Sequence, residues 1–218
     1  MNKNKTINIS LDRAREWYNE SDESLRNFAL ECYSSDELEV IPFEKIKTFK
    51  DAVNALNMDL DFVKSVVAEI EKLSNASAAM YKLNIVRKAL NLGEDLYFTE
   101  ESEDSEIYCP YNPFVTENST FFEKQINSGE MEIIGKIKVQ GILYNVLCGY
   151  ADYGSYYGLG CFYPPAGVGY AESSSSIFGC ANEEIAEHFS KYFGMLITEA
   201  KFGDLPDFEI IEEKYRIN

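Results

Sequence analysis

Cys180 and His188 come nearest, by residue type and spacing, to a catalytic pair. Cys180 precedes a predicted helix whose N-terminus can lower the pKa of a thiol, and His188, the single histidine, is the available base. His188 nevertheless lies roughly 9–10 Å along that helix axis, whereas a hydrogen bond needs ~3–3.5 Å. Cys180 also ends Ile177–Cys180, a run typical of a buried strand. We therefore interpret Cys180 as a buried structural cysteine, and a small cysteine-dependent enzyme stays as an alternative.

No pattern in the chain predicts a metal or cofactor site. The single histidine and the five cysteines, which form no C-x-x-C pair, do not supply the paired ligands of a zinc site. Gly158–Gly160 and Gly167–Gly169 each resemble half of a phosphate loop, but neither continues into a helix, and strand kinks account for them better. The carboxylates are too numerous to single out an acid–base pair. We expect no cofactor, no metal and no catalytic residues, with the cysteines reduced and mostly buried.

The segment 150–176 is distinctive because tyrosine, glycine and serine dominate it, while lysine and arginine are absent. Antibody paratopes use this mixture, since tyrosine gives a large contact area at low entropy cost and glycine and serine give an adaptable backbone. Aromatic rings also suit flat ligands and sugar faces. The alternative is structural, with alternate tyrosines facing a core. We predict a binding surface for a protein or glycan partner, formed by Tyr150, Asp152, Tyr153, Tyr156, Tyr157, Tyr163 and Tyr170.

Residues 1–93 show helical patterns almost throughout. Apolar residues recur at helical spacing, as in the stripe over 60–73 that includes Phe62, and Gly93 is a suitable C-terminal stop. Polar residues suited to N-caps precede several of these stretches. The predicted helices are Leu11–Asn19 after Ser10, Asp22–Tyr33 after Ser21, a short helix beginning at Thr48–Asp51, Leu60–Leu73 and Ala78–Leu92.

An acidic run at residues 94–106 separates this helical region from the rest of the chain. The run holds seven acids and no base, which is typical of a linker or an exposed loop. It lacks the alternating ligands and the central glycine of an EF-hand calcium loop. We therefore predict three parts: a helical region at 1–93, an acidic linker or loop at 94–106, and a mixed region at 107–218.

The sequence of the mixed region, residues 107–218, predicts an antiparallel sheet and one helix. Two runs rich in β-forming residues flank Gln140-Gly141, which indicates a hairpin turn. Asn182 is a suitable N-cap for an amphipathic helix with acids in its first turn. The expected fold class is therefore α+β: a helical N-terminal region, then an antiparallel β-sheet packed with one C-terminal amphipathic helix. The predicted strands are Glu132–Val139, Ile142–Tyr150, Gly158–Tyr163, Ser175–Cys180 and Phe208–Ile211, and the predicted helix is 183–200.

The net charge of −17, from 20 basic and 37 acidic residues, is unusual for a chain of this length. Such a surface repels phosphates, so we expect no direct nucleic-acid binding. An acidic decoy that occupies a nucleic-acid-binding host protein remains an alternative. The sequence has no stretch of ~18 apolar residues that could span a membrane, and its first residues lack the apolar core of ~7–15 residues found in signal peptides. We expect a cytoplasmic protein.

Four stretches carry a further signal: Leu11–Asn19, Ala79–Val86, Ile107–Phe114 and Phe178–Phe193. Together they resemble an uncharacterised family of phage- and prophage-associated proteins of gut anaerobic bacteria. Within the last stretch, Glu184–Phe193 follows the pattern Glu-x-Ala-x-x-Phe-x-Lys-x-Phe. The resemblance covers most of the chain and implies no activity and no catalytic residues. It implies a phage or mobile-element product that acts in the bacterial cytoplasm or is carried in a phage particle.

The residues and this resemblance together predict a non-enzymatic binding or interaction protein that uses its Tyr/Gly/Ser-rich segment. The partner, a protein or a glycan, is not specified by the sequence, and neither is the oligomeric state.

Overall fold

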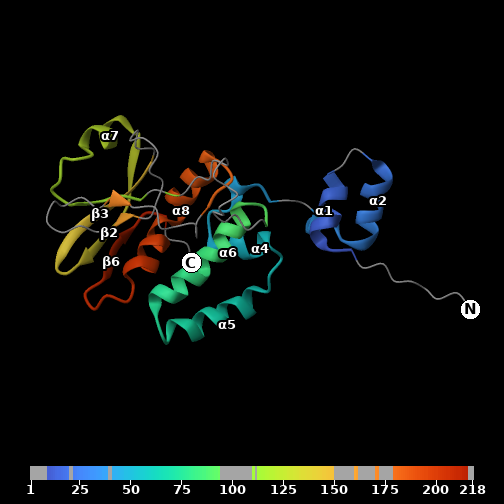
Figure 1. The fold of residues 1–218 in the computed structure, drawn as a ribbon, viewed down its shortest axis with the longest axis horizontal. Helices are drawn as coiled ribbons and strands as arrows, with labels where there is room; N and C mark the ends of the chain where they lie inside the picture. The colour runs from blue at the N-terminus through green and yellow to red at the C-terminus, as the bar shows by residue number, and fades with distance from the viewer. Residues whose placement is uncertain are drawn as a thin grey trace, which may run out of the picture. The chain divides into compact units, whose positions relative to one another are not determined.

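The computed structural model describes residues 9–19, 22–38, 41–93, 110, 112–149, 160–161, 170–171 and 179–215. The chain forms two compact units, residues 1–41 and 42–218, and each is described by itself. The described part of the first unit is helical, whereas the second unit combines helices with a four-stranded antiparallel sheet (Figure 1). The fold class is therefore α+β, as predicted.

The first unit has a small core to which each helix contributes. Its described helices are α1 (Leu11–Asn19), α2 (Glu23–Cys32) and α3 (Ser35–Leu38). Ala14, Ala29 and Leu38, one from each helix, are completely buried. The hydroxyl of Tyr33 donates a hydrogen bond to the carbonyl of Ile9 at 2.7 Å, which ties the segment before α1 to the end of α2.

Six helical elements of the second unit are described. They are the 3-10 helix η1 (Phe43–Lys45) and the α-helices α4 (Phe49–Ala55), α5 (Leu60–Glu71), α6 (Asn75–Leu90), α7 (Glu123–Ser128) and α8 (Glu183–Phe202). α6 packs against α4, α5 and α8 and is therefore largely buried. α5 is buried on a narrower stripe than expected: Val63 and Val67 are buried, whereas Phe62 is 64% exposed.

Two helices begin at residues other than those predicted, and a nearby cap explains each difference. α2 is capped by Asp22 instead of Ser21, because the Asp22 carboxylate accepts hydrogen bonds from the first backbone N–H groups of the helix. α6 begins at Asn75, ahead of the predicted Ala78, because the Ser74 side chain accepts a hydrogen bond from the backbone of Ser77.

The main sheet is antiparallel, with strand order β1-β3-β2-β6. Its strands are β1 (Phe114–Thr116), β2 (Met131–Val139), β3 (Ile142–Gly149) and β6 (Glu209–Glu213). The predicted hairpin is confirmed: Gln140 and Gly141 both have positive φ, at 51° and 79°, and join β2 to β3. Such values suit a two-residue turn with the twist of the strands. β1 and α7 were not predicted.

A second, two-stranded sheet falls in the tyrosine-rich region. β4 (Gly160–Cys161) lies within the predicted strand Gly158–Tyr163 and pairs antiparallel with β5 (Tyr170–Ala171). β5 does not coincide with a predicted strand. Of the predicted strand Ser175–Cys180, only the last two residues lie within the described residues, and Cys180 makes an isolated bridge there.

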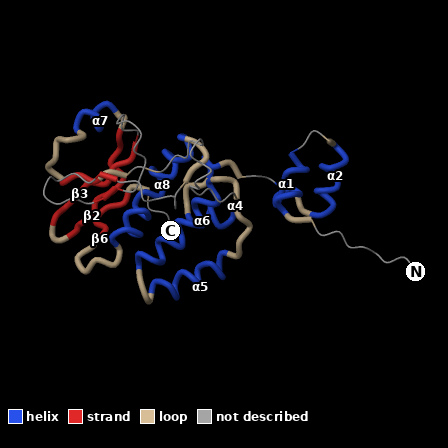
Figure 2. The backbone as a smooth tube through the Cα atoms, viewed as in Figure 1, coloured by secondary structure: helices blue, strands red, loops and turns tan. Residues whose placement is uncertain are grey.

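α8 is the predicted C-terminal helix, capped by Asn182 as expected and two residues longer than the range 183–200. It lies between the sheet and α6 (Figure 2). Gly194 allows the close approach of α8 to the sheet, since a Cβ there would come within 2.3 Å of Asn112 Nδ2 and 2.5 Å of Ile134 Cδ1. The helix and the sheet thus share one core, which includes Met195.

The predicted boundary at 94–106 lies outside the described residues and stays a prediction. The unit that begins at residue 42 contains both the helices from η1 to α6 and the main sheet. Among the described cysteines, Cys148 and Cys180 are buried and Cys32 is exposed. Within the described ranges, no helix combines the length and the apolar character needed to cross a bilayer. No group of three or more potential metal ligands is found there either.

Candidate binding site at the first half of α8

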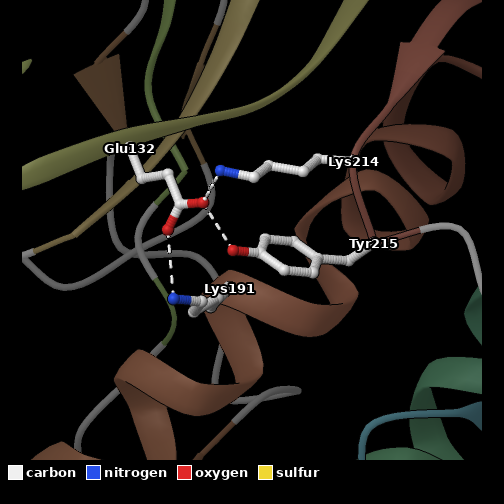
Figure 3. A network of polar contacts seen from close by, with 4 residues as sticks. All are labelled: Glu132, Lys191, Lys214 and Tyr215. Atoms are coloured by element: carbon white, nitrogen blue, oxygen red, sulfur yellow. Dashed lines mark hydrogen bonds and ion pairs between the residues drawn. The ribbon is translucent and has the colours of Figure 1, made fainter.

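Glu132, Lys191, Lys214 and Tyr215 form a polar group between the sheet and α8, which we call the Glu132 cluster (Figure 3). Glu132 belongs to β2, Lys191 to α8, and the other two follow β6. Lys191 Nζ lies 3.0 Å from one carboxylate oxygen of Glu132. The other oxygen accepts hydrogen bonds from Lys214 Nζ and, at 2.5 Å, from the Tyr215 hydroxyl. Three separate parts of the chain therefore meet at one carboxylate.

The electrostatics of the cluster keep its ion pairs charged. Partial burial opposes ionisation of Glu132, but hydrogen bonds from Lys214, Tyr215 and Lys191 outweigh it and lower the pKa of Glu132 to about 2. The hydrogen bond to Glu132 in turn raises the pKa of Lys191. The side chains remain accessible, with exposed fractions of 28% for Glu132, 39% for Lys191 and 54% for Lys214. An arriving ligand could therefore reach two ammonium groups and one carboxylate.

Aromatic rings continue from this cluster along α8. The ring of Tyr215 lies 5.1 Å from that of Tyr192, and Tyr192 lies 4.6 Å from His188. His188 meets the edge of Phe43 at 5.4 Å. The ammonium of Lys47 lies 5.2 Å from the centre of the Tyr192 ring. These four rings and their neighbouring lysines form a continuous aromatic and cationic row, and aromatic rings of this kind stack with flat groups.

His188 has a structural partner in this row. Its Nε2 lies 2.7 Å from the carbonyl oxygen of Ile46, and because a carbonyl only accepts, Nε2 carries the hydrogen. Burial lowers the pKa of His188. A neutral His188 therefore connects α8 to η1.

Cys180 and His188, the catalytic pair considered from the sequence, do not present an exposed nucleophile. Cys180 is completely buried, and the Nε2 hydrogen of His188 is directed to Ile46. The other buried thiol among the described residues, Cys148, has its pKa raised to about 12, chiefly by burial. A thiol with such a pKa is protonated at neutral pH and is a poor nucleophile. Nothing in this geometry favours the cysteine-dependent alternative.

Most of the predicted binding residues lie outside the described residues: Tyr150, Asp152, Tyr153, Tyr156, Tyr157 and Tyr163. Tyr170 is described through its backbone alone, which pairs with Cys161 in the two-stranded sheet. The surface predicted for these seven residues therefore stays a prediction.

The structure does describe both ends of the segment that carries these residues. At the first end, Gly149 pairs with Met131 and Cys148 pairs with Glu132 in the β2–β3 register. At the second end, the buried Asn91 donates from Nδ2 to the Gly179 carbonyl at 2.8 Å and accepts from the Ala181 N–H at 2.9 Å. The first end thus adjoins the Glu132 cluster, and the second adjoins the start of α8.

The Glu132 cluster was missed from the sequence because its members are far apart along the chain. Only the sheet register and the packing of α8 bring Glu132, Lys191 and Lys214 together. One signal was present: residues 111–218 contain only seven basic residues, and two of them belong to this cluster. The seven are Lys124, Lys136, Lys138, Lys191, Lys201, Lys214 and Arg216. Because basic residues are rare in this part of the chain, their positions were a signal that could have pointed to the cluster.

No protein-family model matches this chain, and neither a curated protein nor a solved structure matches it.

Proposed function

We propose that this chain is a non-enzymatic binding protein of a phage or mobile element, which holds a protein or glycan partner with its Tyr/Gly/Ser-rich segment. The proposal rests on one observation: the fold holds both ends of that segment in place. One end continues from β3 beside Glu132, and the other is held by two hydrogen bonds with Asn91, one donated to Gly179 and one accepted from Ala181. The bacterial cytoplasm, or a phage particle, is the proposed place of action.

Fixed ends support a binding role for a physical reason. A segment whose ends are held by the fold has less conformational freedom to lose when a partner orders it, so more of the contact energy remains as affinity. The segment also begins beside the aromatic and cationic row, where Tyr192, Tyr215 and Lys191 are half-buried. Tyrosines from the segment and rings from α8 could then contact the same partner.

The test is a capture experiment from host lysate with the tagged full-length chain and a Tyr153→Ala/Tyr156→Ala/Tyr157→Ala variant. A variant with phenylalanine at the same three positions is the matched control, because it keeps the rings and removes only the hydroxyls. We expect one partner to be retained by the parent chain, reduced with the phenylalanine variant and lost with the alanine variant. Circular dichroism must show that all three are folded.

Two outcomes would contradict the proposal. If the alanine variant unfolds, the three tyrosines belong to a core and do not form a binding surface. If the parent and the folded alanine variant capture the same partners equally, the segment is not the recognition element. Repeating the capture at high salt separates this proposal from the acidic decoy, whose binding would weaken steeply as exposed charges are screened.

A further inference from the structure

The strand β6 is an exposed edge of the main sheet. It is the last strand in the order β1-β3-β2-β6, and within the described residues it pairs with β2 alone. Figure 2 shows β6 at the end of the row of strands. Glu209 and Glu212 are exposed, and Ile211 is 43% exposed although it is apolar. An edge strand offers main-chain donors and acceptors to another extended chain.

An open hollow lies at the start of β6. The β2–β3 turn forms one side with Gln140 and Gly141, and the loop before β6 forms the other with Pro206, Asp207 and Phe208. Lys138 and Glu209 complete the lining. Phe208, whose ring centre lies 6.4 Å from that of Phe202, is the aromatic residue of this lining. Glu209 belongs both to the lining of the hollow and to β6, so the hollow adjoins the start of that strand on the side of β2.

The charge of this region selects the kind of chain that could bind. Asp207 and Glu209 line the hollow with a single lysine, and farther along β6 the carboxylate of Glu212 lies 3.8 Å from Lys136. Pairing of two copies of β6 would bring glutamates close to one another, and like charges on neighbouring strands are destabilising. A chain that carries lysine or arginine would instead meet opposite charge.

We propose that the β6 edge and its adjoining hollow bind an extended, lysine- or arginine-bearing peptide segment of a partner protein. The main chain of the partner pairs with the free edge of β6, and one basic side chain extends across Glu209 toward the hollow. There its aliphatic stem lies on Pro206 and Phe208, and its cationic end meets Asp207 and Glu209. A register shift in the β2–β6 pairing, between Lys136 and Ile137, leaves only a short regular stretch of β6 for main-chain pairing. Selectivity for a basic side chain therefore depends largely on the hollow.

None of the residues of this surface belongs to the Tyr/Gly/Ser-rich segment, so the inference does not depend on the proposed function. The test uses the full chain labelled with ¹⁵N and titrated with a blocked octapeptide of alternating lysine and valine, with backbone amide shifts as the readout. We expect shifts confined to residues 138–141 and 205–213. An Asp207→Asn/Glu209→Gln variant should bind about tenfold more weakly, as expected for the loss of two partly exposed ion pairs.

Three controls make the test specific. A peptide of the same sequence with alternate amide nitrogens methylated keeps its charge but loses main-chain donors, and it should bind much more weakly. A Glu123→Gln/Glu130→Gln variant removes two exposed charges near α7 and should bind as the parent does. The Tyr153/Tyr156/Tyr157 alanine variant should also bind normally.

Several results would overturn the inference. Equal binding of the methylated peptide would mean that main-chain pairing plays no part. Shifts spread over the acidic surface, or equal weakening by the α7 variant, would mean non-specific attraction to the net charge of −17. Dimers in sedimentation, with the shifts at β6 depending on protein concentration, would assign the edge to a second copy of the chain. Absence of binding would also reject the proposal.

Discussion

The two halves of α8 pack against the same sheet but do different things. The first half, residues 183–192, buries Ile185, Ala186 and Phe189 on one face and contributes Lys191, His188 and Tyr192 to a partly exposed row of charges and rings. The second half, residues 193–202, contributes Met195 and Phe202 to the apolar core. The difference teaches that one amphipathic helix can bury apolar residues along its whole length and present a candidate recognition face at one end only.

The sheet sets this division through a bulge in β2. The register with β3 shifts between Ile133 and Gly135, so the regular alternation of side chains along β2 is interrupted. Ile134 and Ile137, an odd number of residues apart, both reach the core shared with α8. Glu132 precedes these core residues along β2, and its carboxylate forms ion pairs with Lys191 and Lys214. Because of the bulge, the side chain of Lys136 stays out of this core, and Glu132 lies at the edge of the core.

The largest expected effect comes from breaking the apolar half. Phe202 is 7% exposed, and its ring lies 5.4 Å from Phe114 and 6.4 Å from Phe208. Phe202→Ala should lower the free energy of unfolding by ~3–5 kcal/mol, because a large buried ring is replaced by a cavity. Urea unfolding followed by circular dichroism would measure it. A loss below ~1 kcal/mol would mean that this half of α8 is not a true core.

A smaller and pH-dependent effect is expected in the polar half. Glu132→Gln should lower the free energy of unfolding at neutral pH by about 1 kcal/mol, after solvent screening of these partly exposed pairs. The pKa of Glu132 is lowered from 4.5 to about 2 in the folded chain. Its stabilising contribution is therefore complete above pH 4.5 and is lost as the pH falls toward about 2.

Unfolding curves of the parent and Glu132→Gln at several pH values would check this window. Glu130→Gln, at an exposed position just before β2, is the matched control and should not reproduce the pH dependence. If the parent and Glu132→Gln differ by the same amount at pH 2 and at pH 6, the cluster contributes through packing and not through charge.

The smallest effect is expected at His188, which is hydrogen-bonded to Ile46 and packs against Tyr192. Burial lowers its pKa below the ordinary 6.5, so the unfolded chain binds a proton more readily than the folded chain. The parent should therefore lose stability relative to His188→Gln as the pH falls below 6.5. Glutamine can still donate to the Ile46 carbonyl, so the two proteins should be nearly equal at pH 8. An identical pH dependence in both would contradict a buried, neutral His188.

Much of the fold could be predicted from local sequence signals. Asn182 and the first-turn acids located the start of α8, and Gln140-Gly141 located the hairpin, because caps and two-residue turns depend on neighbouring residues only. β1 and α7 were missed since both are short and owe their stability to tertiary packing. Val115, which lies within β1, and Phe122, which precedes α7, are buried in a small cluster with Leu147.

The candidate site was less predictable. The sequence drew attention to tyrosines in 150–176, whereas the described geometry drew attention to Glu132, Lys191 and Tyr215, which no local pattern connects. A carboxylate on a strand and a lysine on a helix show no relation in sequence until the register and the packing angle are known. The burial of Cys180, in contrast, was predicted from its place at the end of an apolar run, and the structure confirms that burial.

By itself, the sequence determined the α+β class, the hairpin, the capped helix α8 and the strongly acidic character of the chain. These follow from short-range preferences and from composition. Only the tertiary structure decided which charges meet, which strand is left at the edge of the sheet and which end of α8 stays accessible. Such facts depend on register, on a bulge and on the packing of segments distant in sequence, and these are fixed by the whole fold at once.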